Sequence, residues 1–159
     1  MPFQLTSPSF EHEQEIPTRH TCEGEDVSPA LVWSSPPKGT KSFALIVDDP
    51  DAPDPRAPKR VWVHWVLYGL PADARSLPEG VTRTTLPPGA KEGDNDWRER
   101  GWRGPCPPIG RHRYFFKLYA LDTTLEELGP GATKSDLENA MTGHVLDTAT
   151  LVGTYEKKR

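Results

Sequence analysis

The chain has 159 residues, of which 35% are hydrophobic and 26% are charged, and this indicates a single globular domain spanning residues 1–159. The net charge of −4 argues against a nucleic-acid-binding protein that depends on neutralising phosphates, and no apolar run is long enough to span a membrane. Residues Met1–Gln4 have neither the basic start nor the apolar stretch of a secretory signal, so a cytoplasmic location is expected. The 18 prolines and 13 glycines, scattered between apolar runs, favour a mainly β protein with many chain reversals.

The first third of the chain is predicted to form short strands separated by turns. An edge strand is predicted at Phe3–Leu5 and a short strand at Ala30–Trp33. The run Lys41–Val47 is apolar and rich in residues that favour strands, which predicts a buried central strand. We expect this strand to end at the segment Asp48–Pro55, because its closely spaced prolines should form a rigid, extended loop.

Acidic side chains on this rigid loop would point in fixed directions. Asp49 and Asp51 are therefore candidate site residues, together with Pro53. A solvated acidic turn is the alternative, and it is the commoner outcome for Asp-Pro repeats. Because an X-Pro bond in a tight ligand loop can be cis, the Ala52–Pro53 bond is predicted to be cis.

The next predicted strand, Val61–Leu70, contains a histidine within an apolar run. Strict alternation would place His64 on the same face as Trp62 and Val66, with Trp65 on the opposite and purely apolar face. A histidine on an otherwise apolar face is more often a hydrogen-bonded core residue than a ligand-binding residue. Both interpretations of His64 stay open at this point.

Residues 72–103 contain no long periodic run and are predicted to form a long surface excursion, of the kind that often contributes to a functional rim. One helix is predicted to begin after Thr133, which can cap it, with Asp136 at the capping-box position. A final strand is predicted at Ala149–Tyr155.

The segment between these two regions joins a stiff loop to a long strand. Prolines and glycines dominate Gly104–Gly110, so it can be neither helix nor sheet interior. The aromatic run His112–Leu121 then predicts a buried strand. Alternation places His112, Tyr114 and Phe116 on one face of this strand. A stiff loop beside a histidine and a tyrosine indicates a small-ligand site, although Pro-Pro-x-Gly is also a common turn.

The two cysteines, Cys22 and Cys106, lie far apart in the sequence and lack the paired spacing of a zinc ribbon. Since disulfides are rare in the cytoplasm, we expect free thiols, with a disulfide as the less favoured alternative. A free Cys106 would place a thiol inside the proline-rich loop.

If the three long strands pair in one sheet, their polar residues converge at one end of it. Asp49 and Asp51 follow the first strand and His64 lies in the second. His112 and Tyr114 begin the third. Two imidazoles, a phenol and loop N–H groups would form a donor-rich pocket suited to phosphate, sulfate or carboxylate. The two carboxylates would orient the imidazoles and favour their charged form, or would bind the cationic end of a zwitterion.

Three motifs together resemble the phosphatidylethanolamine-binding protein family, whose members are also called Raf kinase inhibitor proteins. They are DPDAP at Asp49–Pro53, the strand with Trp62-x-His64, and GPCPPIGRHRY at Gly104–Tyr114. Further stretches, among them Thr21–Pro29 and Ala140–Leu146, are similar to the bacterial, YbhB/YbcL-like branch of this family. The resemblance implies a large central antiparallel sheet packed on a smaller sheet, with one or two helices near the C-terminus.

The resemblance also implies an anion pocket at the edge of the large sheet, which accepts phosphate-type groups in that family. Cys106 stands where some relatives have glycine, so it is counted with the pocket. The residues assigned to this pocket are Asp49, Asp51, Pro53, Trp62, His64, Gly104, Cys106, Pro107, His112 and Tyr114.

The favoured function is non-enzymatic binding of small anions, such as phosphorylethanolamine-like head groups or nucleotides, with regulation of a kinase or protease as the implied role. No cofactor is expected, and the bacterial branch is compatible with a homodimer. A hydrolase is the first alternative, with Asp49 and His64 as a base and its orienting partner or with Cys106 as the nucleophile. A metal site is the second alternative, and its ligands would be Asp49, Asp51, His64 and His112.

Overall fold

The computed structural model describes residues 2–158, and this part of the chain forms two antiparallel β-sheets, one α-helix and one short 3-10 helix. Within it, no helix has the length and apolar character needed to cross a membrane. The elements are β1 Gln4–Thr6, η1 Thr18–His20, β2 Leu31–Ser34, β3 Ser42–Ala52, β4 Arg60–Pro71, β5 Ser76–Leu77, β6 Lys91–Glu92, β7 His112–Leu121, α1 Lys134–Met141 and β8 Val145–Tyr155.

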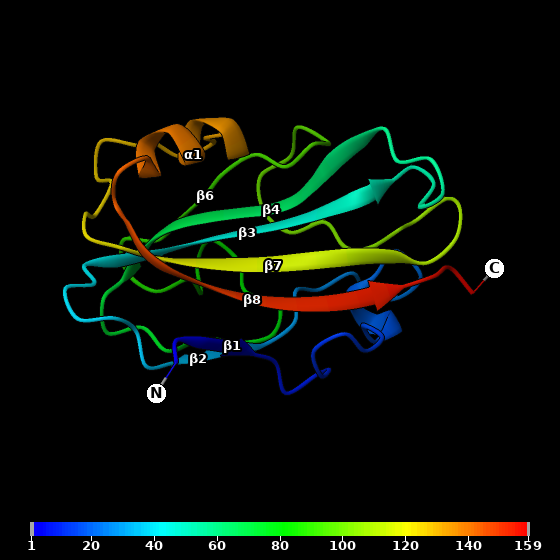
Figure 1. Ribbon diagram of the computed structural model, residues 1–159, viewed down its shortest axis with the longest axis horizontal. Helices are drawn as coiled ribbons and strands as arrows, with labels where there is room; N and C mark the ends of the chain where they lie inside the picture. Colours follow the sequence, from blue (N-terminus) through cyan, green and yellow to red (C-terminus); the bar gives the residue numbers. More distant parts are fainter. Residues whose placement is uncertain (1, 159) are drawn as a thin grey trace.

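The larger sheet has the strand order β6-β4-β3-β7-β8, and the smaller sheet has the order β1-β2-β5. Figure 1 shows the long strands β3, β4, β7 and β8 side by side, with α1 on one side of this sheet and β1 and β2 on the other. The predicted fold of a large antiparallel sheet packed on a smaller one is therefore confirmed.

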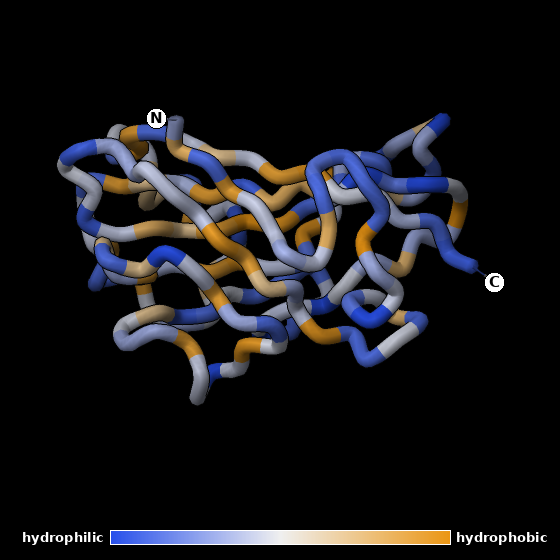
Figure 2. The backbone as a smooth tube through the Cα atoms, turned by 90° about the horizontal axis from the view of Figure 1, so that it is seen from below, coloured by the Kyte–Doolittle hydropathy of each residue, from blue (hydrophilic) through white to orange (hydrophobic). Residues whose placement is uncertain are grey.

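Two apolar cores lie on the two faces of the larger sheet. The main core fills the space between the sheets, where Trp33 of β2 meets Phe43 of β3 with ring centroids 5.6 Å apart. The second core lies under α1, where Leu137 and Met141 pack with Ile46 of β3. Each such side chain stabilises the fold by about 1.5–3 kcal/mol when fully buried. Figure 2 shows apolar residues recurring along the strands, with hydrophilic residues at many of the chain reversals.

The predicted long strands are present, but two of them are longer than expected. β3 continues through Asp48–Ala52, a segment predicted to be a loop, because its extended backbone still pairs with β4, with Asp49 opposite Trp62. β8 begins at Val145, before the predicted start at Ala149, because it pairs along the whole of β7. Residues 72–103 also hold the short strands β5 and β6 within the predicted excursion.

A β-bulge in β4 overturns the predicted division of this strand into two faces. Val47 pairs with Trp65, whereas the next residue, Asp48, pairs with Val63, so His64 is the extra residue of the bulge. Bulges change the direction in which a side chain points and often lie beside functional sites. His64 therefore shares the inter-sheet face with Trp65, although strict alternation placed the two residues on opposite faces.

The predicted helix is confirmed as α1, and so is its capping box. The Asp136 N–H donates to Thr133 Oγ1, and the Thr133 N–H donates to the Asp136 carboxylate. Lys134 Nζ lies 2.9 Å from Asp48 Oδ2 and joins the first turn of the helix to β3. Asp48 thus faces the helix side of the sheet, which leaves its neighbour Asp49 to face the opposite side.

Candidate functional site

A cavity of about 200 Å³ lies at the end of the larger sheet where β3 ends and β7 begins. It brings together most of the predicted pocket residues and adds Ala52, Trp97 and Pro108. Asp51 and Gly104 do not line it. The lining residues are Asp49, Ala52, Pro53, Trp62, His64, Trp97, Cys106, Pro107, Pro108, His112 and Tyr114.

Three strands and one loop position these side chains. Antiparallel pairing of β3 with both β4 and β7 brings the end of the first strand beside the beginnings of the other two. The proline-rich loop before β7 supplies Cys106 and Pro107 as one wall. The Ala52–Pro53 peptide bond is cis, as predicted, and Pro53 lines the cavity at the end of β3.

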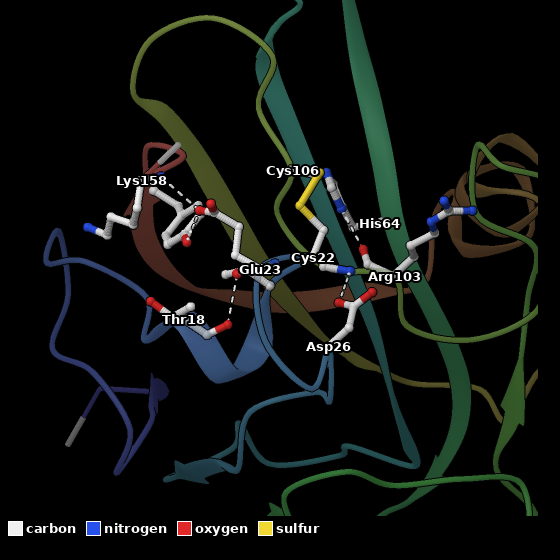
Figure 3. The surroundings of a disulfide bond; sticks show 11 residues. Thr18, Cys22, Glu23, Asp26, His64, Arg103, Cys106 and Lys158 are labelled. Carbon is white, nitrogen blue, oxygen red and sulfur yellow. Dashed lines mark hydrogen bonds between the residues drawn. A yellow bond between two sulfur atoms is a disulfide. The ribbon is translucent and has the colours of Figure 1, made fainter.

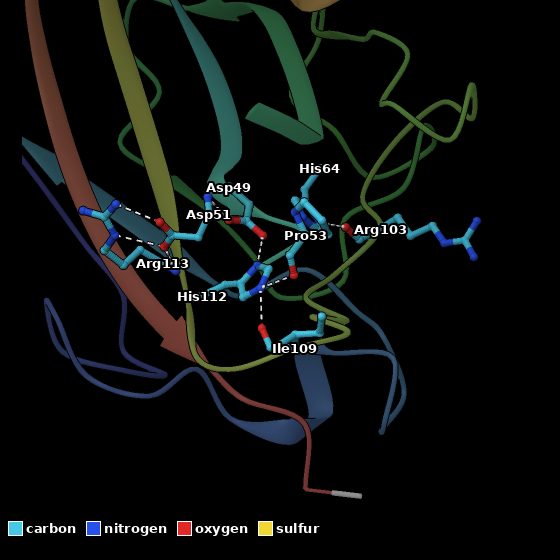
Figure 4. Close-up of polar contacts among 8 residues, drawn as sticks. All are labelled: Asp49, Asp51, Pro53, His64, Arg103, Ile109, His112 and Arg113. Carbon is cyan, nitrogen blue, oxygen red and sulfur yellow. Dashed lines mark hydrogen bonds and ion pairs between the residues drawn. The ribbon is translucent and has the colours of Figure 1, made fainter. Parts of the chain in front are cut away.

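His112 is buried and has a partner at each ring nitrogen (Figure 4). Its Nδ1 lies 2.5 Å from Asp49 Oδ2, and its Nε2 lies 2.9 Å from the carbonyl oxygen of Ile109 and 3.1 Å from that of Pro53. Carbonyl oxygens only accept, so Nε2 carries a proton. Burial opposes the charge on the ring, but the hydrogen bond and the charge of Asp49 outweigh it and raise the pKa of His112.

His64 is buried as well, but its environment differs. Its Nδ1 donates to the carbonyl oxygen of Arg103 over 2.6 Å, and the Arg103 N–H donates back to the His64 carbonyl oxygen over 3.2 Å. No residue in the described range 2–158 bonds to Nε2, the nitrogen that His64 can offer to a ligand. Burial lowers the pKa of His64, and the opposing effects of the Arg103 bond and of nearby carboxylates are smaller.

Tyr114 lies beside both histidines and has an unsatisfied hydroxyl group. Its ring centroid is 5.2 Å from that of His64 and 6.4 Å from that of His112. The hydroxyl oxygen is inaccessible to solvent and has no hydrogen-bond partner among the described residues. Burial raises the pKa of Tyr114, so the hydroxyl keeps its proton and can donate. A buried polar group without a partner is rare, and near a cavity it indicates a place for a ligand.

Trp62 and Trp97 form an aromatic wall, and Trp97 was not among the predicted site residues. Their ring centroids are 5.3 Å apart, and Trp97 also meets His64 edge to face at 5.0 Å. The buried Asn95 holds the loop in place, because its Oδ1 accepts from the Trp97 N–H over 2.9 Å. The sequence signal for Trp97 was its position in the polar surface segment 72–103. That position predicted the rim of a functional site but not contact with His64.

Asp51 and Gly104, the two predicted pocket residues that do not line the cavity, hold the segments around it in place. Asp51 accepts from the Arg113 backbone N–H and from two nitrogens of its guanidinium at 2.8–3.0 Å, and these bonds lower the pKa of Asp51. The Gly104 N–H donates to Asp26 Oδ1 over 2.8 Å. Asp51 thus anchors the end of β3 on β7, and Gly104 anchors the proline-rich loop on the N-terminal segment.

Cys22 and Cys106 form a disulfide, so the prediction of free thiols was wrong (Figure 3). The sulfur of Cys106 is therefore bonded within the wall of the cavity and cannot act as the nucleophile of the hydrolase alternative while the bridge is intact. The prediction of free thiols depended on a cytoplasmic location. Because disulfides are typical of oxidising environments, that location stays a prediction.

Four aspartates at or near the cavity are paired with cationic side chains, which offset their negative charge. Asp49 pairs with His112 and Asp51 with Arg113. Asp48 pairs with Lys117 and Lys134, and Asp96 pairs with Arg60.

Only part of the predicted set of donors is available. Both ring nitrogens of His112 are used within the protein, and the prolines at 53, 107 and 108 have no N–H, whereas the Tyr114 hydroxyl and the Trp62 Nε1–H are buried donors without a partner among the described residues. Among the ligands of the metal-site alternative, Asp49 and His112 bond to each other, Asp51 bonds to Arg113, and His64 Nδ1 bonds to the Arg103 carbonyl oxygen. Across residues 2–158 no group of histidine, cysteine, aspartate and glutamate side chains is arranged to hold a metal ion.

Comparisons with known proteins identify the family and agree with the fold. Residues 6–156 match the family model described as phosphatidylethanolamine-binding protein. A UPF0098 protein of Methanothermobacter thermautotrophicus is 50% identical over 154 residues, which cover 96% of this chain and 98% of the relative.

Two solved structures share the whole fold. A putative phosphatidylethanolamine-binding protein homologue of Chlamydia trachomatis has a TM-score of 0.89 at 42% identity, and the match covers 98% of each chain. YbcL of E. coli, described as a new member of the mammalian PEBP family, has a TM-score of 0.89 at 36% identity, with 99% of this chain and 100% of YbcL covered. With the family match extending over nearly all of the sequence, the chain belongs to the phosphatidylethanolamine-binding protein family.

Proposed function

We propose that this protein binds the anionic head group of a small phosphorylated molecule in the cavity, without chemical turnover. The observation that carries the proposal is the Tyr114 hydroxyl, a buried donor with no partner in the described chain, beside the open Nε2 of His64. A ligand oxygen at this place would satisfy the hydroxyl, whose burial otherwise costs about 1–3 kcal/mol.

The size and the walls of the cavity support a head group in preference to a whole lipid. A volume of about 200 Å³ is below the range of roughly 300–1,000 Å³ that is typical for drug-sized ligands. The walls are apolar, because Trp62, Trp97 and Pro107 supply them. The charge of His112 lies behind Tyr114 and would favour an anion, although Asp49 offsets part of it.

The features near the cavity favour binding over hydrolysis. The Cys106 sulfur is held in the disulfide, and the raised pKa of Tyr114 leaves its hydroxyl un-ionised and weakly nucleophilic. Regulation of a kinase or protease, which the family resemblance implies, would depend on this binding step and belongs to the same proposal.

The test is calorimetric titration of the purified protein with phosphorylethanolamine and with methyl phosphate. Saturable binding is expected, with an affinity at least about tenfold lower in His64→Ala, a loss of about 1.4 kcal/mol. His144→Ala is the control, because His144 is exposed and pairs with Asp122 outside the cavity. Absence of binding by either compound at millimolar concentration would refute the proposal, and steady release of inorganic phosphate would assign a hydrolase instead.

A further inference from the structure

The hydrogen bond of His64 to the main chain determines what its free nitrogen can do. The partner of Nδ1 is the Arg103 carbonyl oxygen at 2.6 Å, which only accepts, so Nδ1 carries the proton (Figure 4). In the neutral ring the proton is then absent from Nε2, and Nε2 presents a lone pair. The polar atom that His64 offers to the cavity is therefore an acceptor.

The charged and titratable groups around His64 do not change this state. Asp49 and Asp48 of β3 and Asp96 of the loop after β6 favour the charged ring, but burial of the ring outweighs them and lowers the pKa of His64. From β7 the facing groups are Tyr114, which stays un-ionised, and the paired His112 behind it. Near neutral pH the imidazole of His64 is consequently uncharged.

The unpartnered polar atoms of the cavity residues are few. Among the described residues, the Tyr114 hydroxyl and the Nε1–H of Trp62 are buried donors without a partner, whereas both nitrogens of His112 are occupied and the wall prolines have no N–H. These two donors accompany one acceptor, His64 Nε2. A ligand that satisfies all three atoms must carry a donor for His64 as well as acceptor oxygens.

This requirement separates two classes of tetrahedral oxyanion. A fully ionised sulfate ester presents only acceptor oxygens, so one of them would face the lone pair of His64. A phosphomonoester monoanion keeps one P–OH, which can donate to Nε2 while a second oxygen accepts from Tyr114. We propose that the cavity selects oxyanions that carry a donatable proton, such as phosphomonoester monoanions, over fully ionised oxyanions of the same shape, an inference that rests on the proposed function.

Binding of a phosphomonoester in this way changes the number of protons that the ligand carries. The complex holds one proton between Nε2 and the ligand oxygen. Since the second pKa of a phosphomonoester is about 6, the free ligand is mostly a dianion above that pH and binding must take up a proton. The apparent affinity for a phosphomonoester should therefore fall by up to about tenfold per pH unit above pH ~7.

The experiment compares methyl phosphate with methyl sulfate, which differ chiefly in the ionisable oxygen. Calorimetry at about pH 6.5, 7.5 and 8.5, in two buffers of different ionisation enthalpy, gives the affinity and the number of protons exchanged. We expect methyl phosphate to bind at least about tenfold more tightly than methyl sulfate near pH 6.5, with uptake of close to one proton near pH 8.

A matched pair of variants assigns the selectivity to His64. The amide of His64→Gln can turn its N–H₂ toward the ligand, so methyl sulfate should bind better and the ratio of affinities should fall toward one. His144→Gln changes an exposed histidine outside the cavity and should keep the wild-type ratio.

The outcomes separate this inference from the proposed function. Equal affinity of the wild-type protein for the two esters, or binding without proton uptake near pH 8, overturns the inference and leaves anion binding in place. Binding of neither ester refutes the proposed function itself. The wild-type measurements decide both points even if His64→Gln does not fold.

Discussion

At the scale of single residues, the two histidines of the cavity have different charges because they have different partners. His112 bonds to the carboxylate of Asp49 and to two carbonyl oxygens, so its charged form is stabilised in spite of burial. His64 bonds to one carbonyl oxygen and is buried among aromatic rings, so it is neutral near physiological pH. One histidine supplies charge and the other supplies a hydrogen-bond acceptor.

Asp49→Asn should remove a pH-dependent part of the free energy of unfolding. The pKa of His112 is raised in the folded protein, so its stabilisation is complete below the unfolded pKa of about 6.5 and is lost as the pH rises through the folded pKa. Breaking a buried ion pair costs about 3–5 kcal/mol. We therefore expect Asp49→Asn to lower the free energy of unfolding by about 3 kcal/mol near pH 6, and by progressively less at higher pH.

Urea denaturation across about pH 5–9 measures this difference. The control is Asp122→Asn, which breaks the exposed pair with His144 and should change the free energy by less than about 1 kcal/mol. A difference between wild type and Asp49→Asn that grows with pH would contradict the assignment of the charge to His112.

Tyr114→Phe should separate ligand binding from stability. The hydroxyl has no partner in the described chain, so its removal costs no hydrogen bond and should leave the free energy of unfolding unchanged or raise it by up to about 1 kcal/mol. Affinity for methyl phosphate should fall about tenfold, because the donor is lost. Thermal unfolding and calorimetry measure the two effects. Unchanged affinity would show that the hydroxyl does not contact the ligand.

At the scale of elements, the cavity depends on one bulge and one anchored loop. The bulge turns His64 toward β7, where its ring meets Tyr114. Two hydrogen bonds anchor the proline-rich loop on the N-terminal segment, because the Gly104 N–H donates to the Asp26 carboxylate and the Cys22 N–H donates to the Pro105 carbonyl oxygen. These contacts hold Cys106 and Pro107 in the cavity wall.

Gly104→Ala should disrupt this loop. A Cβ at position 104 would lie 2.0 Å from the main-chain oxygen of His20 and 2.5 Å from Asp26 Oδ1, so the loop must move away from the N-terminal segment. We expect a loss of stability of about 1–3 kcal/mol together with weaker binding of methyl phosphate. Gly129→Ala is the matched control, because a Cβ there meets nothing within 4 Å.

Chemical denaturation and calorimetry on both glycine variants check the expectation. Gly129→Ala should behave like the wild type in both measurements. If Gly104→Ala did so as well, close packing of this loop on the N-terminal segment would not be needed for the cavity.

At the scale of the whole molecule, the disulfide joins segments that the sheets alone would leave apart. Cys22 follows η1 in the N-terminal segment, and Cys106 lies in the loop before β7, with a sequence separation of 84 residues. Figure 3 shows the bridge close to His64, and Cys106 lines the cavity. The bridge is thus expected both to stabilise the fold and to hold one wall of the cavity in position.

The double variant Cys22→Ala/Cys106→Ala should lower both stability and affinity. Closing a loop of this length restricts the unfolded chain, and loss of such a native bridge typically costs about 2–5 kcal/mol. Affinity for methyl phosphate should fall as well, because the wall loses its tether. Denaturation and calorimetry on the purified variant test the two parts, and an unchanged denaturation midpoint would contradict a stabilising role for the bridge.

The sequence by itself determined the strands, the capped helix and most of the cavity residues. Alternation along β7 placed His112, Tyr114 and Phe116 on one face correctly, because this strand pairs without interruption until its last residues. The spacing of Thr133 and Asp136 predicted the capping box, because a cap is a local interaction over a single helical turn. The family motifs predicted that residues from three strands meet in one cavity, because a chain with these motifs is expected to adopt the family's fold, in which these strands pair.

Only the tertiary structure decided the direction of His64, the inclusion of Trp97 and the bond between the cysteines. The bulge arises from the pairing of β4 with β3, and alternation within one strand contains no signal for it. Trp97 reaches the cavity because Asn95 folds its own loop back on β4. The cysteines meet because the N-terminal segment packs against the proline-rich loop, and that contact brings together residues remote in sequence, which spacing alone does not specify.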